Sequence, residues 1–240
     1  MVKTHYITIF RLTTFAGLTA GLLISCAVKP NNSGPPVQVQ PYQQRLETAQ
    51  AKQPAIRAEY KALSVLELIR RLESDSSKDV EPFNSLAYRE AVARGAAIGR
   101  ELATSIKSQD RSSFLTLLAV RKTYREGYDA LDAKSKAAIL VSALQNSKYF
   151  NAWGLPHLYW EDAAKALIEL KDVAAPALTA LLQEQRTAPL WGSEEAMESK
   201  AYNYRLKDYA WALLLEISGE KVTIPREAGA RDQLISTMKK

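Results

Sequence analysis

The most constraining feature of this chain is the helical spacing of its apolar residues, which recur at three- and four-residue intervals from about Leu63 onward. Such spacing lays one apolar stripe along a helix, whereas a half-buried strand alternates apolar and polar residues. Glycine and proline number only ten each, and apolar residues make up 47% of the chain, which is enough to build a core. The sequence therefore predicts an all-α domain over residues 61–240.

Capping signals mark the start of two predicted helices. Ser64 is followed three residues later by Glu67, the spacing of a capping box. Asp132 precedes a helical pattern and is expected to cap it. The apolar stripe of the helix after Ser64 is expected to contain Leu66, Leu68, Ile69 and Leu72.

A single long helix is predicted over residues 85–107, where the amphipathic pattern is continuous. Gly95 and Gly99 lie one turn apart within it. These glycines indicate either close packing of a neighbouring helix or a flexible point, and close packing is the favoured interpretation.

Two further helix pairs are predicted near the C-terminus. The segment EDAAKALIELKDVAAPALTALLQE, residues 161–184, has Pro176 where a second helix would begin, a position that proline tolerates. The segments RLKDYAWALLLEISGE and REAGARDQLISTMKK form the other pair, with Gly219 ending the first of its helices. These segments resemble HEAT-type repeats over about residues 160–240, although an insertion at about 185–204 departs from that pattern. The resemblance implies antiparallel helix pairs stacked as a short α-solenoid. A compact helical domain is the alternative, because two repeats are few for a solenoid.

The first 25 residues have the parts of a secretory signal peptide. Lys3 and Arg11 are followed by an uncharged, mostly apolar run over residues 12–24 and then by small residues. The alternative is an uncleaved anchor, since the uncharged span 12–28 is close to the shortest that crosses a core of about 30 Å.

The segment Leu23-Ile24-Ser25-Cys26 resembles the lipobox of bacterial lipoproteins. The resemblance implies cleavage before Cys26 and acylation of this residue, which is the only cysteine in the chain. Residues 26–60 would then form the lipidated cysteine and a flexible tether rich in proline and glutamine. We therefore expect a lipid-anchored protein of the cell envelope, with the membrane as a partner. In a Gram-negative organism, Ala27 after the cysteine implies the periplasmic face of the outer membrane.

The sequence offers little catalytic chemistry. Outside the predicted signal peptide His157 is the only histidine, and Cys26 is the only cysteine, so no Cys/His zinc site can form. The chain contains no P-loop, dinucleotide-binding, H-E-x-x-H or G-x-S-x-G pattern. We predict no catalytic constellation, no metal site and no cofactor, although carboxylate-dependent hydrolysis stays open. The net charge of +6 is spread along the chain, so no nucleic-acid partner is expected.

Two aromatic-rich segments, residues 148–162 and 189–208, interrupt the helical pattern, and each contains a Trp-Gly pair. Both lead into a predicted helix, so we expect them to emerge on one edge of the stack and to meet. The candidate binding surface consists of Trp153, His157, Trp160, Trp191, Glu194, Glu195, Tyr202, Tyr204 and Arg205, with Asn151 as a further polar contact.

The alternative, which is favoured, is that most of these aromatic side chains fill gaps between helices. His157 is more typical of a structural turn than of a catalytic base. Glu194 and Glu195 are not expected to act as a catalytic pair, because adjacent side chains diverge.

Two functions follow as hypotheses. The first is a membrane-anchored envelope lipoprotein whose helical domain binds a partner protein without catalysis. The second is a module that binds or hydrolyses envelope glycan, such as peptidoglycan, through the two Trp-Gly segments.

Overall fold

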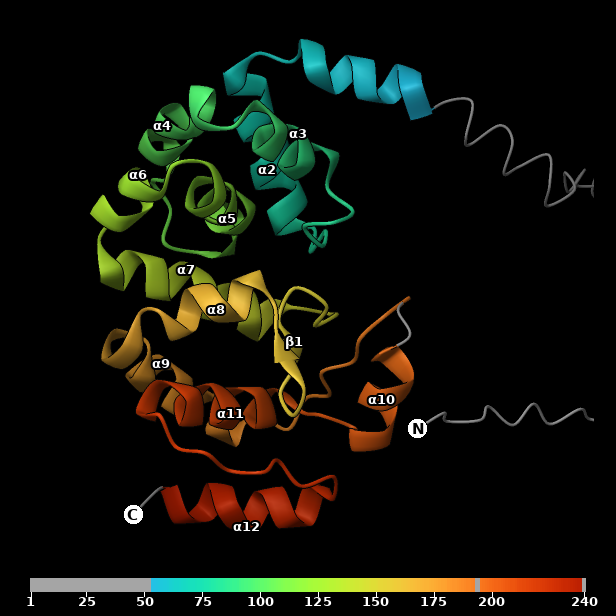
Figure 1. Ribbon diagram of the computed structural model, residues 1–240, viewed down its shortest axis with the longest axis vertical. Coiled ribbons are helices and arrows are strands. Elements are labelled where there is room, and N and C mark those ends of the chain that lie inside the picture. Colours follow the sequence, from blue (N-terminus) through green and yellow to red (C-terminus); the bar gives the residue numbers. More distant parts are fainter. Residues whose placement is uncertain (1–52, 193–194, 239–240) are drawn as a thin grey trace, which may run out of the picture.

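The part of the chain that the structure describes folds mostly into short helices (Figure 1). The computed structural model describes residues 53–192 and 195–238. Within these ranges the strands are two short ones, β1 (Gly154–Leu155) and β2 (Tyr159–Trp160), which pair antiparallel with Gly154 opposite Trp160. The predicted all-α class is confirmed. The predicted signal peptide, Cys26 and most of the predicted tether lie outside the described residues.

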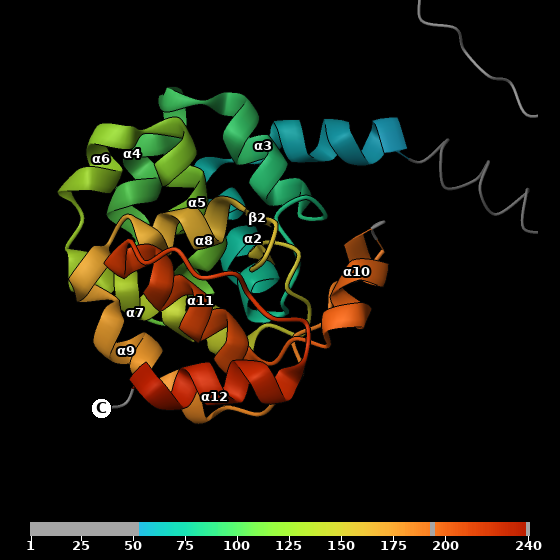
Figure 2. The same cartoon turned by 60° about the horizontal axis from the view of Figure 1, so that its bottom comes forward.

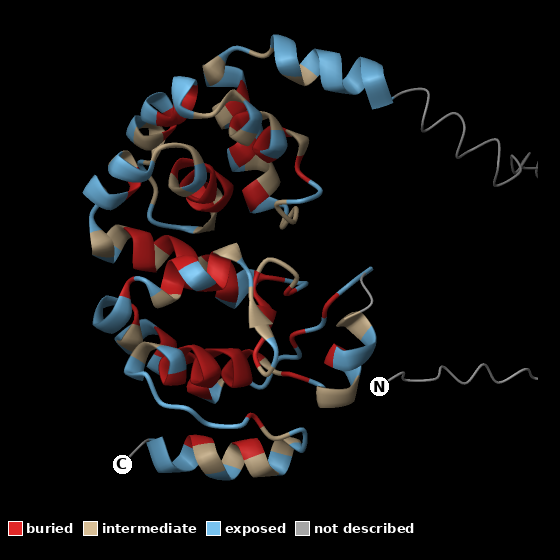
Figure 3. Ribbon diagram, viewed as in Figure 1, coloured by how far each residue is buried: buried red, intermediate tan, exposed pale blue. Residues whose placement is uncertain are grey.

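The first half of the domain surrounds one buried helix, α5 (Phe114–Thr123), in which every residue from Phe114 to Val120 is buried (Figure 3). A helix that is apolar on all sides is stable only when other elements cover it. The covering elements are α2 (Val65–Ser77), α3 (Leu86–Arg94), α4 (Ala96–Ser105) and α6 (Arg125–Ala130). A 3-10 turn over Arg111–Ser113 leads into α5.

The second half surrounds a second buried helix, α11 (Leu206–Ser218), which packs on α8 (Asp162–Ile168) and α9 (Ala175–Ala180). Further 3-10 turns span Lys171–Val173 and Leu181–Gln183. α7 (Ala133–Asn146) contacts helices of both halves, so one continuous core runs through the domain. α10 (Glu195–Tyr202) stands apart from the stack beside the β ribbon, and α12 (Ala228–Met238) ends the described chain (Figure 2).

The predicted caps are confirmed. Ser64 and Glu67 form a reciprocal capping box, and the Asp132 side chain accepts a hydrogen bond from the Ser135 N–H. Gly219 ends α11 in the left-handed conformation, with φ of 74°. The stripe predicted after Ser64 is partly wrong, because Leu66 is exposed whereas Leu68 and Leu72 are buried.

The predicted long helix over residues 85–107 is wrong. Gly95 has φ of 61°, a conformation that L-residues rarely adopt, and it separates α3 from α4. At Gly99 the favoured close packing is confirmed. A Cβ atom added there would lie 2.5 Å from the Cβ of Tyr124, so α4 reaches the start of α6 only because this residue lacks a side chain.

The helical body begins earlier than predicted, because residues 53–62 form a helix within the region expected to be tether. This helix lies at one end of the stack (Figure 1). The Arg94 guanidinium holds its end by donating hydrogen bonds to the carbonyl oxygens of Tyr60 and Lys61, at 2.9 and 3.2 Å.

Candidate binding groove

The two aromatic-rich segments meet, as predicted. The Phe150 N–H donates a hydrogen bond of 2.9 Å to the Pro189 carbonyl oxygen. Next to it, the Asn151 side chain donates to the Trp191 carbonyl oxygen and accepts from the Trp191 N–H, both at 3.0 Å. Both polar atoms of the Asn151 amide are thus used within the protein, so this side chain does not supply the ligand contact predicted for it.

Several of the predicted binding aromatics are core residues. Trp153 is fully buried, stacks on Phe114 with ring centroids 5.9 Å apart, and donates its indole N–H to the Ser147 hydroxyl at 3.1 Å. Tyr204 is also buried, and Trp160 is half-buried with its ring 6.4 Å from that of Tyr209. The gap-filling interpretation is therefore correct for Trp153 and Tyr204.

His157 fastens α10 to the turn between β1 and β2. Its Nδ1 lies 2.8 Å from the Tyr204 hydroxyl, and its ring stacks on Tyr202 at 3.9 Å between centroids. Its Nε2 lies 3.4 Å from Glu198 Oε1, on α10. Burial lowers the pKa of His157, and the negative charge of Glu198 only partly offsets this. The contacts leave the imidazole 14% exposed, as expected for a structural residue.

Arg205 belongs to an ion-pair network between α11 and α12. Its guanidinium lies 2.9 Å from Asp208 and 2.8 Å from Asp232, and hydrogen bonds to Asp208 are the main reason that the pKa of Arg205 is raised. Arg231 and Asp208 are fully buried and lie 3.2 Å apart. Arg205 is therefore occupied by protein carboxylates. No pattern in the sequence indicated that Arg231 would be buried beside Asp208.

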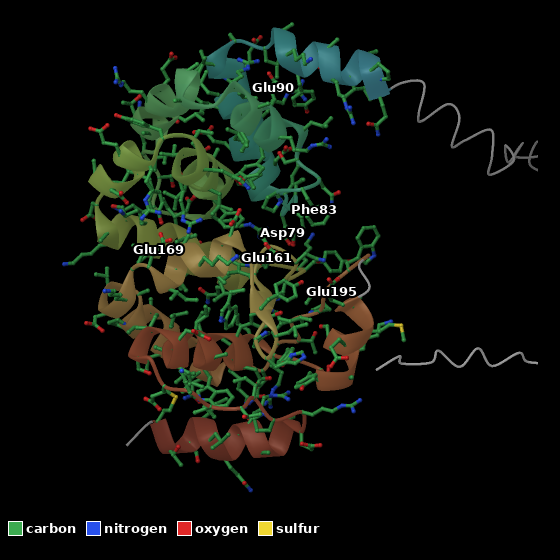
Figure 4. The ribbon with its side chains drawn as sticks, in the orientation of Figure 1. Asp79, Phe83, Glu90, Glu161, Glu169 and Glu195 are labelled. Carbon is green, nitrogen blue, oxygen red and sulfur yellow. The ribbon has the colours of Figure 1, made fainter. Side chains whose placement is uncertain are left out.

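An open groove of about 880 Å³ runs between the loop before α3 and the start of α8. Its walls carry the exposed rings of Phe83 and Trp191, with 54% and 60% of their surface accessible. We call it the aromatic groove. Its lining includes Phe83, Tyr88, Arg89, Tyr159, Trp191 and Glu195. Figure 4 shows Phe83, Glu161 and Glu195 on the same side of the molecule, between its two halves.

Only some of the charged side chains that line the aromatic groove form ion pairs. Lys122 lies 3.2 Å from Asp162, which neutralises one lining carboxylate. Glu161 and Glu195 form no ion pair within the described ranges. Burial raises the pKa of Tyr159, and the negative charges of Glu195 and Glu161 raise it further. Both carboxylates therefore act on the same phenol.

Glu81 lies directly before Pro82, at the edge of the groove. Burial raises its pKa to about 8, and the negative charge of Asp79 adds to this. Its Oε2 atom is buried and has no hydrogen-bond partner among the residues that the structure describes. Asp79 itself pairs with Arg111 and accepts a hydrogen bond of 2.5 Å from the Lys148 N–H. This acidic pair thus joins the α2–α3 connection to the second half of the domain.

The predicted binding surface does not form one site. Trp191 and Glu195 line the aromatic groove, whereas His157, Trp160 and Tyr202 line a separate hollow of about 630 Å³ beside residues 219–224. Trp153, Tyr204 and Arg205 are engaged in the core and in the ion-pair network, and Glu194 lies outside the described residues.

Sequence reasoning missed Phe83, Tyr88 and Arg89, on the far wall of the groove. Phe83 follows Pro82 in a short connection between helices. The aromatic side chain of Phe83 in this short connection was the only feature of the local sequence that indicated this wall of the groove.

Over residues 53–192 and 195–238, no three histidine, cysteine, aspartate or glutamate side chains gather closely enough to hold a metal ion. No helix in the same ranges is long and apolar enough to cross a bilayer.

No protein-family model, curated protein or solved structure matches this chain.

Proposed function

We propose that this protein is a lipid-anchored, non-enzymatic binding protein of the bacterial cell envelope. Its helical domain would hold a segment of a partner protein in the aromatic groove. The lipobox at residues 23–26 supports the anchor, with Cys26 as the lipid attachment point. Two or three acyl chains give stable membrane attachment, whereas one gives only marginal attachment.

The observation that carries the binding function is the pair of exposed rings on facing walls, Phe83 and Trp191. Large exposed apolar side chains around a concave surface are typical of interaction sites. Tryptophan and tyrosine are also the residues that contribute most to binding at protein interfaces. Tyr88, which is largely buried, and the half-buried Tyr159 also line the groove.

Binding is favoured over catalysis by the state of the polar side chains. His157, the only histidine that the structure describes, is enclosed by Tyr202, Tyr204 and Glu198. Asn151, which could have contacted a glycan, is bound to the Trp191 backbone. The described lining of the groove thus places no histidine beside its carboxylates. The Asn151 amide is not free to contact a ligand.

Site-specific photo-crosslinking in cells tests the binding function. A photoreactive phenylalanine analogue at position 83 or 191 should crosslink one specific protein. The same analogue at Val173, which is 41% exposed and outside the groove, should not. Equal crosslinking from all three positions, or none from positions 83 and 191, would count against a partner in the groove.

The anchor has a separate test. Cys26→Ala should abolish incorporation of a fatty-acid tracer and leave an unprocessed precursor. Continued lipid labelling of this variant would refute the assignment of Cys26, without bearing on the groove.

A further inference from the structure

The aromatic groove has one wall of negative charge. Glu161 lies just before α8 and Glu195 begins α10, and neither forms an ion pair within the part of the chain that the structure describes. Figure 4 shows both on the side of the molecule that carries Phe83. Their charges both act on Tyr159, which lines the groove together with the exposed Trp191.

The rest of the groove does not cancel this charge. Asp162 and Lys122 neutralise each other at 3.2 Å. Arg89 is the remaining basic residue of the lining, and it lies on α3, on the wall that carries Phe83. The groove therefore combines two unpaired carboxylates and two aromatic rings on one wall with apolar surface and a single cation, Arg89, on the other, so its lining keeps a net negative charge.

This combination matches a cation carried on an apolar chain. Lysine and arginine side chains are attracted to the faces of tyrosine and tryptophan rings, and carboxylates add a Coulomb attraction. Apolar residues on either side of the cation would cover Phe83, which is 54% exposed. A volume of about 880 Å³ is near the upper end of ligand pockets and can hold several side chains.

We propose that the aromatic groove binds an extended segment of a partner protein in which one lysine or arginine is flanked by apolar residues. The cationic side chain lies against Tyr159 and Trp191, near Glu161 and Glu195, and the flanking residues cover Phe83. This inference rests on the proposed binding function and names the chemistry of the partner.

A set of three peptides tests the charge preference. The probes are fluorescent, acetylated and amidated heptapeptides of sequence Ala-Val-Phe-X-Phe-Val-Ala, in which X is lysine, norleucine or glutamate. Binding is measured by fluorescence anisotropy on the full, lipidated chain in nanodiscs of phosphatidylcholine, which carries no net charge. The lysine peptide should bind about tenfold more tightly than the norleucine peptide, and the glutamate peptide should bind most weakly. Higher salt should reduce the preference for lysine.

Matched variants assign the preference to the acidic wall. In Glu161→Gln/Glu195→Gln the lysine and norleucine peptides should bind with affinities within about twofold of each other. Glu73→Gln/Glu126→Gln removes the same charge from exposed positions on α2 and α6, and it should retain the tenfold preference. Trp191→Ala should weaken the binding of all three peptides.

Several results would overturn the proposal. Equal binding of the lysine and norleucine peptides by the unaltered chain would do so, as would no binding of any peptide. A lysine preference that survives in Glu161→Gln/Glu195→Gln would do the same.

Binding that emerges only after residues 27–52 are replaced by a Gly-Ser linker would identify the chain's own tether as the occupant. Dimers that Trp191→Ala dissociates would identify a second copy of the chain. Crosslinking from positions 83 and 191 together with no charge preference would refute this inference alone and leave the proposed function standing.

Discussion

The Asn151 side chain and the Trp191 backbone form a closed pair of hydrogen bonds, each 3.0 Å long. These bonds hold the exposed indole of Trp191 at the rim of the aromatic groove, where no helix supports it. Each such bond contributes about 0.5–1.5 kcal/mol net. The Asn151 amide therefore fixes the backbone at Trp191, while the indole ring itself contacts Tyr149, with ring centroids 6.1 Å apart.

Asn151→Ala should lower the free energy of unfolding by about 1–2 kcal/mol, because it removes both bonds. It should also speed amide hydrogen exchange over residues 189–192, since the backbone N–H of Trp191 loses its acceptor. Urea unfolding and exchange mass spectrometry measure the two effects. Asn146→Ala is the control, because the Asn146 amide donates only to the Ser142 carbonyl oxygen of its own helix. Unchanged exchange over residues 189–192 in Asn151→Ala would contradict this role.

The fold class and several helix ends could be predicted because they depend on local signals. The Ser64 capping box, the Asp132 cap and the left-handed Gly219 all follow from the chemistry of a few neighbouring residues. The break at Gly95 was missed because the same glycine is tolerated within a helix at a cost of about 1 kcal/mol. Here packing of α3 and α4 against α5 overrides the continuous amphipathic pattern.

The site could be predicted only in part, for a related reason. The sequence identified Trp191 and Glu195 because they lie in a segment that breaks the helical pattern. Phe83 and Arg89 lie more than a hundred residues earlier, on a loop and a helix with no distinctive pattern. They face Trp191 only because the two halves of the domain stack through α7.

The buried pair of Asp208 and Arg231 should dominate the stability of the C-terminal helices. Both are fully buried, and Arg205 also depends on Asp208. Asp208→Ala leaves the Arg231 guanidinium buried without its anion, which costs about 3–5 kcal/mol. Urea unfolding should show this loss, and α12 should exchange its amides faster. Asp232→Ala, at a position 44% exposed, should cost less, about 1–2 kcal/mol, because Asp232 is partly solvated although the largely buried Lys207 loses its partner 2.7 Å away. Equal losses in the two variants would show that burial of Asp208 has no special effect.

Two glycine substitutions should have opposite effects. A Cβ at Gly99 would meet the Cβ of Tyr124 at 2.5 Å, so Gly99→Ala should destabilise the domain by about 1–3 kcal/mol despite its better helix propensity. Gly229 in α12 has no atom within 4 Å of its added Cβ. Gly229→Ala should therefore be neutral or stabilising by up to about 1 kcal/mol. Thermal unfolding measures both, and stabilisation by Gly99→Ala would contradict the close contact between α4 and Tyr124.

Glu81 should make the folded state less stable as the pH rises. Its pKa is about 8 in the folded protein, raised by burial and by Asp79, against an ordinary value of 4.5. The folded state therefore favours the protonated carboxyl. Below pH 4.5 the carboxyl is protonated in both the folded and the unfolded chain, so its titration costs no stability. As the pH rises towards about 8 the unfolded chain loses this proton first, and the free energy of unfolding falls by an amount on the order of a few kcal/mol.

Glu81→Gln keeps the shape of the side chain and removes its titration. The variant should therefore unfold at a higher urea concentration than the unaltered chain at pH 8.5, and the difference should shrink or reverse at pH 5. Comparing the two chains cancels the titration of all other groups. Glu73→Gln, at an exposed position on α2, serves as the control and should show no pH-dependent difference. Parallel stability curves for Glu81→Gln and the unaltered chain between pH 5 and 8.5 would show that Glu81 titrates normally.

Glu81 adjoins Pro82 and Phe83, so its ionisation should also destabilise the local structure of the Phe83 wall of the aromatic groove. Amide exchange over residues 80–85 should therefore be faster at high pH in the unaltered chain, and Glu81→Gln should not show this increase.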